Sequence, residues 1–132
     1  MRFEVGTRRP DDRLAGVSRD IFVQDIPAGI ASVDAIPDDW HPRPLPFGHA
    51  QVLEAVLELA PEADTADPEW IHVTLPGVDV EVSVTDERPL QQFALHVRAV
   101  DPVAANAFIA GLLDLLGARA FDPESEGGIF QS

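Results

Sequence analysis

The 132-residue chain contains no cysteine, no lysine and no tyrosine. Without cysteine it can form no disulfide, no thiolate metal site and no cysteine nucleophile. No apolar run approaches the roughly 20 residues that span a membrane, and the basic N-terminus lacks the apolar stretch of a secretory signal. We therefore expect a cytoplasmic protein. The nine basic residues are all arginine, which we interpret as the codon bias of a GC-rich, bacterial genome.

Common catalytic and cofactor motifs are also missing. The chain has no glycine-rich phosphate loop, no Gly-x-Ser-x-Gly elbow and no His-Glu-x-x-His pair. Its acidic stretches lack the ligand spacing of a calcium loop, and the serines at 18, 32, 83 and 125 have no base nearby in the sequence. We therefore expect a non-enzymatic protein without a cofactor.

Positive charge is scarce beyond the N-terminal segment. The formal net charge is −14, and the residues after Arg19 carry four arginines against twenty acidic residues. Such an excess opposes non-specific binding to nucleic acids and to anionic membranes. The nine aromatic residues also leave little for stacking on bases. The charge serves either solubility alone or the attraction of a basic protein partner.

Three consecutive runs between residues 71 and 100 alternate apolar and polar side chains. This period of two predicts half-buried strands. Pro76-Gly77 and residues 85–91 are turn signals, and connections this short join antiparallel neighbours. A slip of one residue would turn every side chain to the wrong face. The simplest register therefore places Val80 between Val73 and Val97.

The same register places His72, Glu81 and His96 in one row on the polar face. Two imidazoles and a carboxylate are plausible ligands for zinc or another divalent ion, and imidazoles suit acid–base chemistry near neutral pH. A cross-strand charge ladder explains the same residues more simply. This row carries an alternative hypothesis, a small metal- or ligand-binding domain that uses the polar sheet face.

Two helices are predicted on either side of these strands. Residues 49–60 carry an apolar stripe that Pro61 ends. Residues 102–116 follow Asp101, a good N-cap, and stop before Gly117. The second helix is apolar nearly all round, so it needs burial on more than one side. A homodimer through this helix, as a structural or accessory protein, is a third interpretation.

The remaining segments are less regular. Residues 27–48 are rich in proline, which excludes a regular helix or a central strand. They predict an extended wrap with Trp40, Leu45 and Phe47 as anchors. Residues 1–19 hold a short strand at 2–5 and otherwise lack apolar periodicity, which is typical of a mobile N-terminal segment.

Further strands are predicted at residues 21–26 and at the C-terminal end, where short apolar runs on both sides of Gly127-Gly128 favour a terminal hairpin. Strands grouped between helices and joined by short turns are typical of the α+β class. We expect residues 1–132 to form a single α+β domain. It should hold one antiparallel sheet of about four to six strands, with two helices packed on one face.

The stretch from Phe93 to Phe130 resembles a layout found in small acidic bacterial proteins of unknown function. A strand leads into an apolar helix, then a Leu-Gly turn, then a short strand that ends in Asp and a glycine-containing turn. Some such proteins are similar to immunity proteins, which neutralise the toxins of neighbouring bacteria. The resemblance implies a binding role and carries no catalytic residue.

These observations favour a protein-binding domain, of an immunity or inhibitor type, for a basic partner. An acidic surface would speed the encounter, and a few desolvated contacts would hold the complex. Two acidic segments, 62–69 and 122–126, are the predicted contact surface. Its predicted residues are Glu62, Asp64, Asp67, Glu69, Asp122, Glu124 and Glu126, with Trp70 at one rim.

Overall fold

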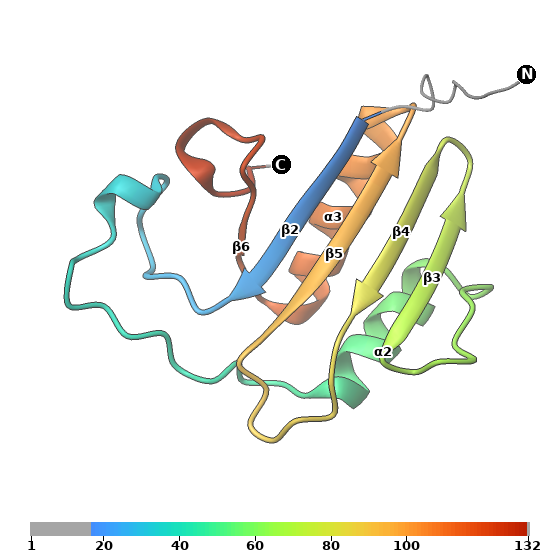
Figure 1. Ribbon diagram of the computed structural model, residues 1–132, viewed down its shortest axis with the longest axis horizontal. Helices are drawn as coiled ribbons and strands as arrows, with labels where there is room; N and C mark the ends of the chain where they lie inside the picture. Colours follow the sequence, from blue (N-terminus) through green and yellow to red (C-terminus); the bar gives the residue numbers. More distant parts are fainter. Residues whose placement is uncertain (1–16, 132) are drawn as a thin grey trace, which may run out of the picture.

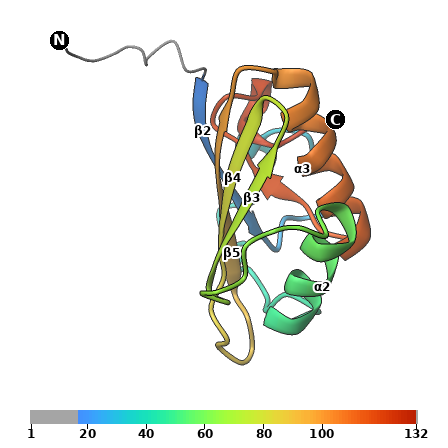
Figure 2. The same cartoon turned by 90° about the vertical axis from the view of Figure 1, so that its right-hand side faces the viewer.

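A five-stranded sheet forms one layer of the structure and two helices form the other. The computed structural model describes residues 17–131. The strands lie in the order β3-β4-β5-β2-β6, and every neighbouring pair is antiparallel (Figure 1). Both helices cover the same face of the sheet (Figure 2), which confirms the predicted α+β class. The strands are β2 (Val17–Gln24), β3 (Trp70–Leu75), β4 (Val78–Ser83), β5 (Gln92–Ala99) and β6 (Ala120–Phe121); the helices are α2 (His49–Leu59) and α3 (Pro102–Leu116), with short 3-10 turns η1 (Val33–Ala35) and η2 (Glu126–Gly128).

The predicted register of the three central strands is confirmed. Val80 on β4 pairs with Val73 on β3 and with Val97 on β5, and Leu75 pairs with Val78. The two-residue turn at Pro76-Gly77 joins the last pair of β3 and β4, Leu75 and Val78. The apolar side chains of all three strands therefore point to the helix-covered face.

The core lies between that face and the two helices. Burying one large apolar side chain stabilises the fold by about 1.5–3 kcal/mol, so these side chains supply most of the driving force for folding. Fully buried residues from the sheet are Ile21, Val23, Ile71, Val73, Val80, Val82 and Leu95; those from the helices are Val52, Val56, Ile109 and Leu112.

The ends of α3 follow the sequence signals. The Asp101 carboxylate accepts a hydrogen bond of 3.1 Å from the Ala104 N–H. Gly117 adopts a left-handed conformation with φ +62°, and the Ala118 N–H donates to the Leu113 carbonyl at 3.0 Å. The predicted bounds of α3 are confirmed, while α2 ends one residue before its predicted end. No helix within residues 17–131 is long and apolar enough to cross a membrane.

Strand β2 differs from its prediction. It begins at Val17 and ends at Gln24, whereas the sequence indicated residues 21–26. The first half of β2 was missed because residues 18–20 are all polar and show no alternation of apolar and polar side chains. Arg19 occupies a position on the helix-covered face, where the pattern of a half-buried strand requires an apolar residue. Residues 17–19 thus belong to the sheet and not to a mobile terminal segment. The rest of that segment, with the predicted strand at 2–5, lies outside the described residues.

Residues 27–48 wrap around the domain with only η1 as regular structure (Figure 1). Leu45 is buried, and its N–H donates to the Leu90 carbonyl at 2.8 Å. Phe47 packs edge-on against Phe93, with 6.2 Å between ring centroids. Trp40 is half-buried. The extended wrap therefore agrees with the prediction, and two of its three anchors contact the β4–β5 region.

The predicted terminal hairpin is confirmed in part, because its two arms pair antiparallel over a short distance. β6 pairs with β2, and only one bridge, between Phe121 and Ile129, joins the two predicted hairpin arms. Gly127 and Gly128 have φ values of +81° and +80° and lie in η2. They form a compact loop against η1 instead of a two-residue hairpin turn.

Candidate functional site

The face of the sheet away from the helices carries the predicted polar row. His72, Glu81 and His96 lie side by side on β3, β4 and β5, as the sequence indicated. Strand β2 extends the row, because Asp20 pairs with His96. The four side chains alternate imidazole and carboxylate across the sheet, and a shallow hollow of about 280 Å³ lies over them.

The side chains of this row do not converge on one point. His96 Nδ1 lies 2.9 Å from Asp20 Oδ1, and since a carboxylate only accepts, the ring nitrogen donates. His72 turns towards Asp79 instead, with 3.9 Å between Nε2 and Oδ1. Among residues 17–131, no group of three or more potential ligands could hold a metal ion. His72 and His96 thus pair with Asp79 and Asp20, while Glu81 lies between them without an ionic contact to any residue of 17–131. This geometry gives the metal hypothesis no support.

Trp70 begins β3 and remains 44% exposed. Its ring stacks on the His96 imidazole, with 5.5 Å between centroids and an interplanar angle of 29°. Trp70 pairs with Ser83 on β4, whose small side chain lets the indole reach across to β5. An aromatic ring that stacks on the sheet is therefore presented at the surface.

The loop of residues 61–69 is fixed in place beside Trp70. Asp64 and His72 exchange two backbone hydrogen bonds of 2.8 and 3.0 Å. The Pro68 carbonyl accepts a bond of 2.6 Å from His49 Nε2 at the start of α2. The Trp70 N–H donates to the Asp67 carbonyl at 3.0 Å. These contacts tie the loop to both β3 and α2, and they cover part of the free edge of β3.

Two carboxylates also shape the loop from within. Asp64 Oδ1 accepts from the Ala66 N–H at 2.9 Å, and Asp67 Oδ1 accepts from the Glu69 N–H at 3.0 Å. Both side chains remain exposed while they make these turns. The loop is therefore ordered before any partner arrives, which lowers the entropic cost of binding.

Charge is distributed unevenly across the molecule. Residues 44–87, which we call the acidic edge, form α2, the 61–69 loop, β3 and β4 and contain no arginine (Figure 1). Within the described part of the chain, none of their carboxylates pairs with an arginine, and the one ionic contact is His72–Asp79. Among residues 17–131, the negative charge of the acidic edge is therefore not offset by any arginine. Its acidic residues are Glu54, Glu58, Glu62, Asp64, Asp67, Glu69, Asp79, Glu81, Asp86 and Glu87.

The second predicted contact segment, 122–126, does not join this surface. The strand order places β6 and the loop after it at the opposite end of the sheet from β3. Glu124 and Glu126 are exposed there, but Asp122 is fully buried. Arg19 Nη2 and the Ser125 hydroxyl donate to its Oδ2, and the Glu124 N–H donates to its Oδ1. Buried and satisfied in this way, Asp122 is not placed to contact a partner.

The Arg19–Asp122 pair was not predicted from the sequence. Arg19 is 14% exposed, donates to Asn106 Oδ1 at 2.8 Å and lies 6.0 Å from the centre of the Phe130 ring. The pair links β2, α3 and the C-terminal loop, which is a structural role. One signal was available, because Asp-x-x-Ser at 122–125 is typical of a turn whose aspartate caps its own backbone.

The chain matches no family model, no curated protein and no solved structure. Its function is therefore argued from the geometry above.

Proposed function

We propose that this protein is a non-enzymatic domain that binds a basic protein partner through the acidic edge and Trp70. The observation that carries the proposal is an exposed tryptophan, stacked on His96, beside a hydrogen-bonded loop of carboxylates that no described arginine neutralises. Tryptophan is the residue most often found as a binding hot spot. Charges around such a residue govern the encounter and the choice of partner.

The two parts of the surface have different tasks. The acidic edge attracts a basic partner over a distance of about 10 Å, beyond which salt screens the interaction. Trp70 then supplies the desolvated contact that slows dissociation. An inhibitor or immunity role against a basic toxin, in the cytoplasm of a bacterium, is the form of this proposal that the resemblance favours.

Capture of the partner with matched variants tests the proposal. The immobilised protein is exposed to a lysate of the source organism at low salt, and bound proteins are identified by mass spectrometry. One variant replaces Glu62 and Glu69 by Gln and Asp64 and Asp67 by Asn. Asparagine keeps the Oδ1 acceptors of the loop turns, so the loop shape is preserved while its charge is lost. We expect a basic protein to bind the wild type and to be lost from this variant and from Trp70→Ala.

The control variant is Glu124→Gln with Glu126→Gln, which removes two carboxylates at the opposite end of the sheet. It should capture the same protein as the wild type. Capture of the same proteins by all variants, or of an acidic protein, would contradict the proposed contact surface.

A further inference from the structure

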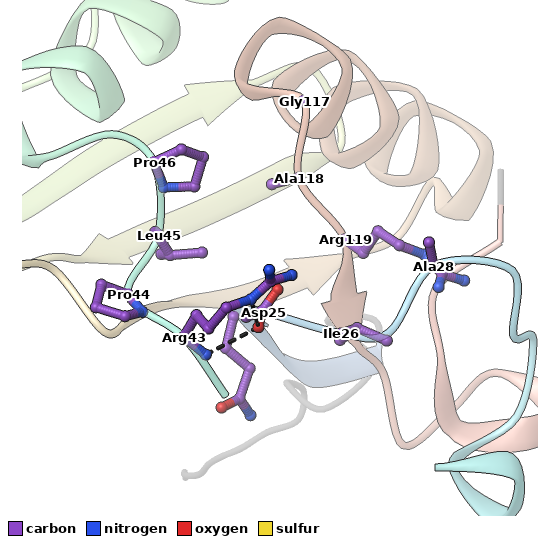
Figure 3. A pocket seen from close by; sticks show the side chains of 11 residues that line it. Asp25, Ile26, Ala28, Arg43, Pro44, Leu45, Pro46, Gly117, Ala118 and Arg119 are labelled. Carbon is purple, nitrogen blue, oxygen red and sulfur yellow. Dashed lines mark hydrogen bonds and ion pairs between the residues drawn. The ribbon is translucent and has the colours of Figure 1, made fainter. Parts of the chain in front are cut away.

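A pocket of about 440 Å³ opens at the C-terminal end of β2 (Figure 3). Residues 24–26 form its floor, residues 43–46 of the wrap form one wall and residues 117–119 after α3 form the other. The pocket shares only the uncharged residues 44–46 with the acidic edge. A function for this pocket is therefore independent of the one proposed above.

Arg43 is held in a defined position in this pocket. Its backbone N–H and its Nε both donate to Asp25 Oδ2, at 2.8 and 3.2 Å. The ring of Trp40 lies 5.8 Å from the guanidinium carbon. The side chain is nonetheless 76% exposed, and its two Nη atoms have no partner within residues 17–131. Figure 3 shows the guanidinium lying across Asp25, towards the space between the two walls.

Asp25 keeps this guanidinium in place across neutral pH. Its carboxylate is 17% exposed and forms an ion pair with Arg43. The Arg43 backbone N–H is the main reason that the pKa of Asp25 lies below its ordinary value. The guanidinium adds to this effect, and burial opposes it. The carboxylate therefore stays ionised, and the free side of the guanidinium is directed away from it.

The pocket carries more positive than negative charge, in a protein whose formal net charge is −14. Arg119 brings a second guanidinium at the Ala28 end (Figure 3). It donates to the carbonyls of Pro27 and Ile30, which are neutral, so its charge is not cancelled by a described carboxylate. Two arginines thus face one aspartate.

The rest of the lining is mostly apolar. Ile26, Leu45 and Ala118 are buried or half-buried, and prolines 44 and 46 stand beside them. A volume within the 300–1,000 Å³ typical of ligand sites, with apolar walls and few fixed polar groups, favours a small organic ligand. An arginine whose Nη atoms are free in one plane matches a carboxylate, which it can bind with two parallel hydrogen bonds.

We propose that this pocket binds a small organic carboxylate with an apolar body, and that the Nη atoms of Arg43 bind the carboxylate. A phosphoryl group suits the site less well. Gly117 marks the carbonyl end of α3, whose partial negative charge disfavours a dianion. The pocket also has no helix N-terminus or glycine-rich loop of the kind that binds phosphate.

Titration with a defined probe tests this inference. Phenylacetate is added to the ¹⁵N-labelled protein and the amide shifts are followed by NMR. Phenylacetamide serves as the uncharged match and phenyl phosphate as the other oxyanion. We expect phenylacetate to bind with a dissociation constant of about 1 mM, as is usual for so small a ligand. The shifts should be confined to residues near 24–28, 43–46 and 117–119.

The variants separate recognition from a structural role. Arg43→Lys keeps the charge but loses the two parallel donors, and it should weaken phenylacetate binding at least tenfold. Asp25→Asn keeps an acceptor for the Arg43 N–H but removes the charge that orients the guanidinium, and it should weaken binding too. Arg98→Lys changes an exposed arginine elsewhere and should bind as the wild type does. If Arg43 had only a structural role, the Arg43→Lys variant would prefer phenylacetate over phenylacetamide as strongly as the wild type does.

Four results would overturn the inference. These are the absence of saturable shifts with phenylacetate, equal binding of phenylacetamide, tighter binding of phenyl phosphate, and undiminished carboxylate binding by Arg43→Lys. None of these results would bear on the proposed binding of a basic partner. The Trp70 surface lies on β3, at the opposite edge of the sheet from β6.

Discussion

At the scale of single residues, the Asp122 carboxylate is the charged group that the described residues bury completely. Asp122→Ala leaves the Arg19 guanidinium without its carboxylate in a mostly buried place, and it removes the acceptor of the Ser125 hydroxyl. Breaking a buried ion pair in this way costs about 3–5 kcal/mol. Since Arg19 keeps some contact with water and with Asn106, we expect a loss of about 3 kcal/mol in the free energy of unfolding, measured by urea denaturation.

The control for that measurement is Glu124→Ala on the same loop. Its side chain is exposed, so the change should stay within about 0.5 kcal/mol. Equal effects of the two substitutions would mean that Asp122 is not the structural group described above.

The ion pair of Asp25 gives a pH-dependent contribution to stability. The Arg43 N–H, followed by its guanidinium, holds the pKa of the folded carboxyl below its ordinary value. A carboxyl with a lowered folded pKa stabilises the protein at higher pH, and this contribution disappears as the pH falls through the folded pKa. Because Arg43 is exposed, we expect Asp25→Asn to lower the free energy of unfolding by only about 0.5–1 kcal/mol at pH 7.

That difference should shrink as the pH falls below the ordinary range of aspartate and through the lowered folded pKa of Asp25, because the wild-type carboxyl then loses its charge. Urea denaturation of both proteins at several pH values measures it. A difference that stays constant over the whole range would show that Asp25 acts through its shape and not through its charge.

At the scale of elements, the contact between η2 and η1 fixes the C-terminal loop. Gly127 has φ +81°, and a Cβ atom there would lie 2.7 Å from the Ala31 carbonyl oxygen. Gly29 has a similar φ of +82° but open space around it. Left-handed backbone costs a non-glycine residue about 1–2 kcal/mol. We therefore expect Gly29→Ala to cost about that much and Gly127→Ala at least 1 kcal/mol more.

Thermal unfolding of the two glycine variants under the same conditions provides the comparison. If both lose the same stability, the loop does not depend on its contact with η1, and backbone strain alone accounts for the effect.

The elements that the sequence predicted well are those joined by short turns. The register of β3, β4 and β5 followed from alternating residues, because a slip would have exposed valines such as Val80. The position of β2 between β5 and β6 could not be read in the same way. Its partners on β5 and β6 come 68 and more residues later, counted from the pair Gln24–Gln92, and no local pattern encodes such a pairing.

In the candidate site, too, contacts between residues far apart in the chain could not be predicted from the sequence. Trp70 and the 61–69 loop are contiguous in the chain, so the sequence could mark them together. Asp122 looked like one more surface acid because its partner, Arg19, lies 103 residues earlier. Arg43 and Asp25 meet only because the wrap returns to the end of β2, and proline-rich chain carries no period from which that return could be predicted.

At the scale of the whole molecule, the structure bears on the homodimer that the apolar α3 suggested. The buried face of α3 packs against α2 and against strands β4 and β5 of the sheet. Its large exposed apolar side chains, Val103 and Leu115, lie twelve positions apart, or about 18 Å along the helix. They form no continuous patch, and a net charge of −14 on each chain opposes association.

Sedimentation equilibrium decides the point. We expect one species of 14.3 kDa across the concentration range. A mass that rises with concentration, and is lowered again by Val103→Asp, would establish the homodimer through α3 instead.

The measurement that tests the central proposal most directly is the salt dependence of binding to the captured basic partner. Association and dissociation rates are compared for the wild type, the loop variant with neutral residues at 62, 64, 67 and 69, and Trp70→Ala. We expect the wild-type association rate to fall about tenfold between low and physiological salt. The loop variant should lose most of that dependence, while Trp70→Ala should keep it and dissociate faster. An association rate that does not respond to salt, or responds equally in wild type and loop variant, would contradict the role of the acidic edge.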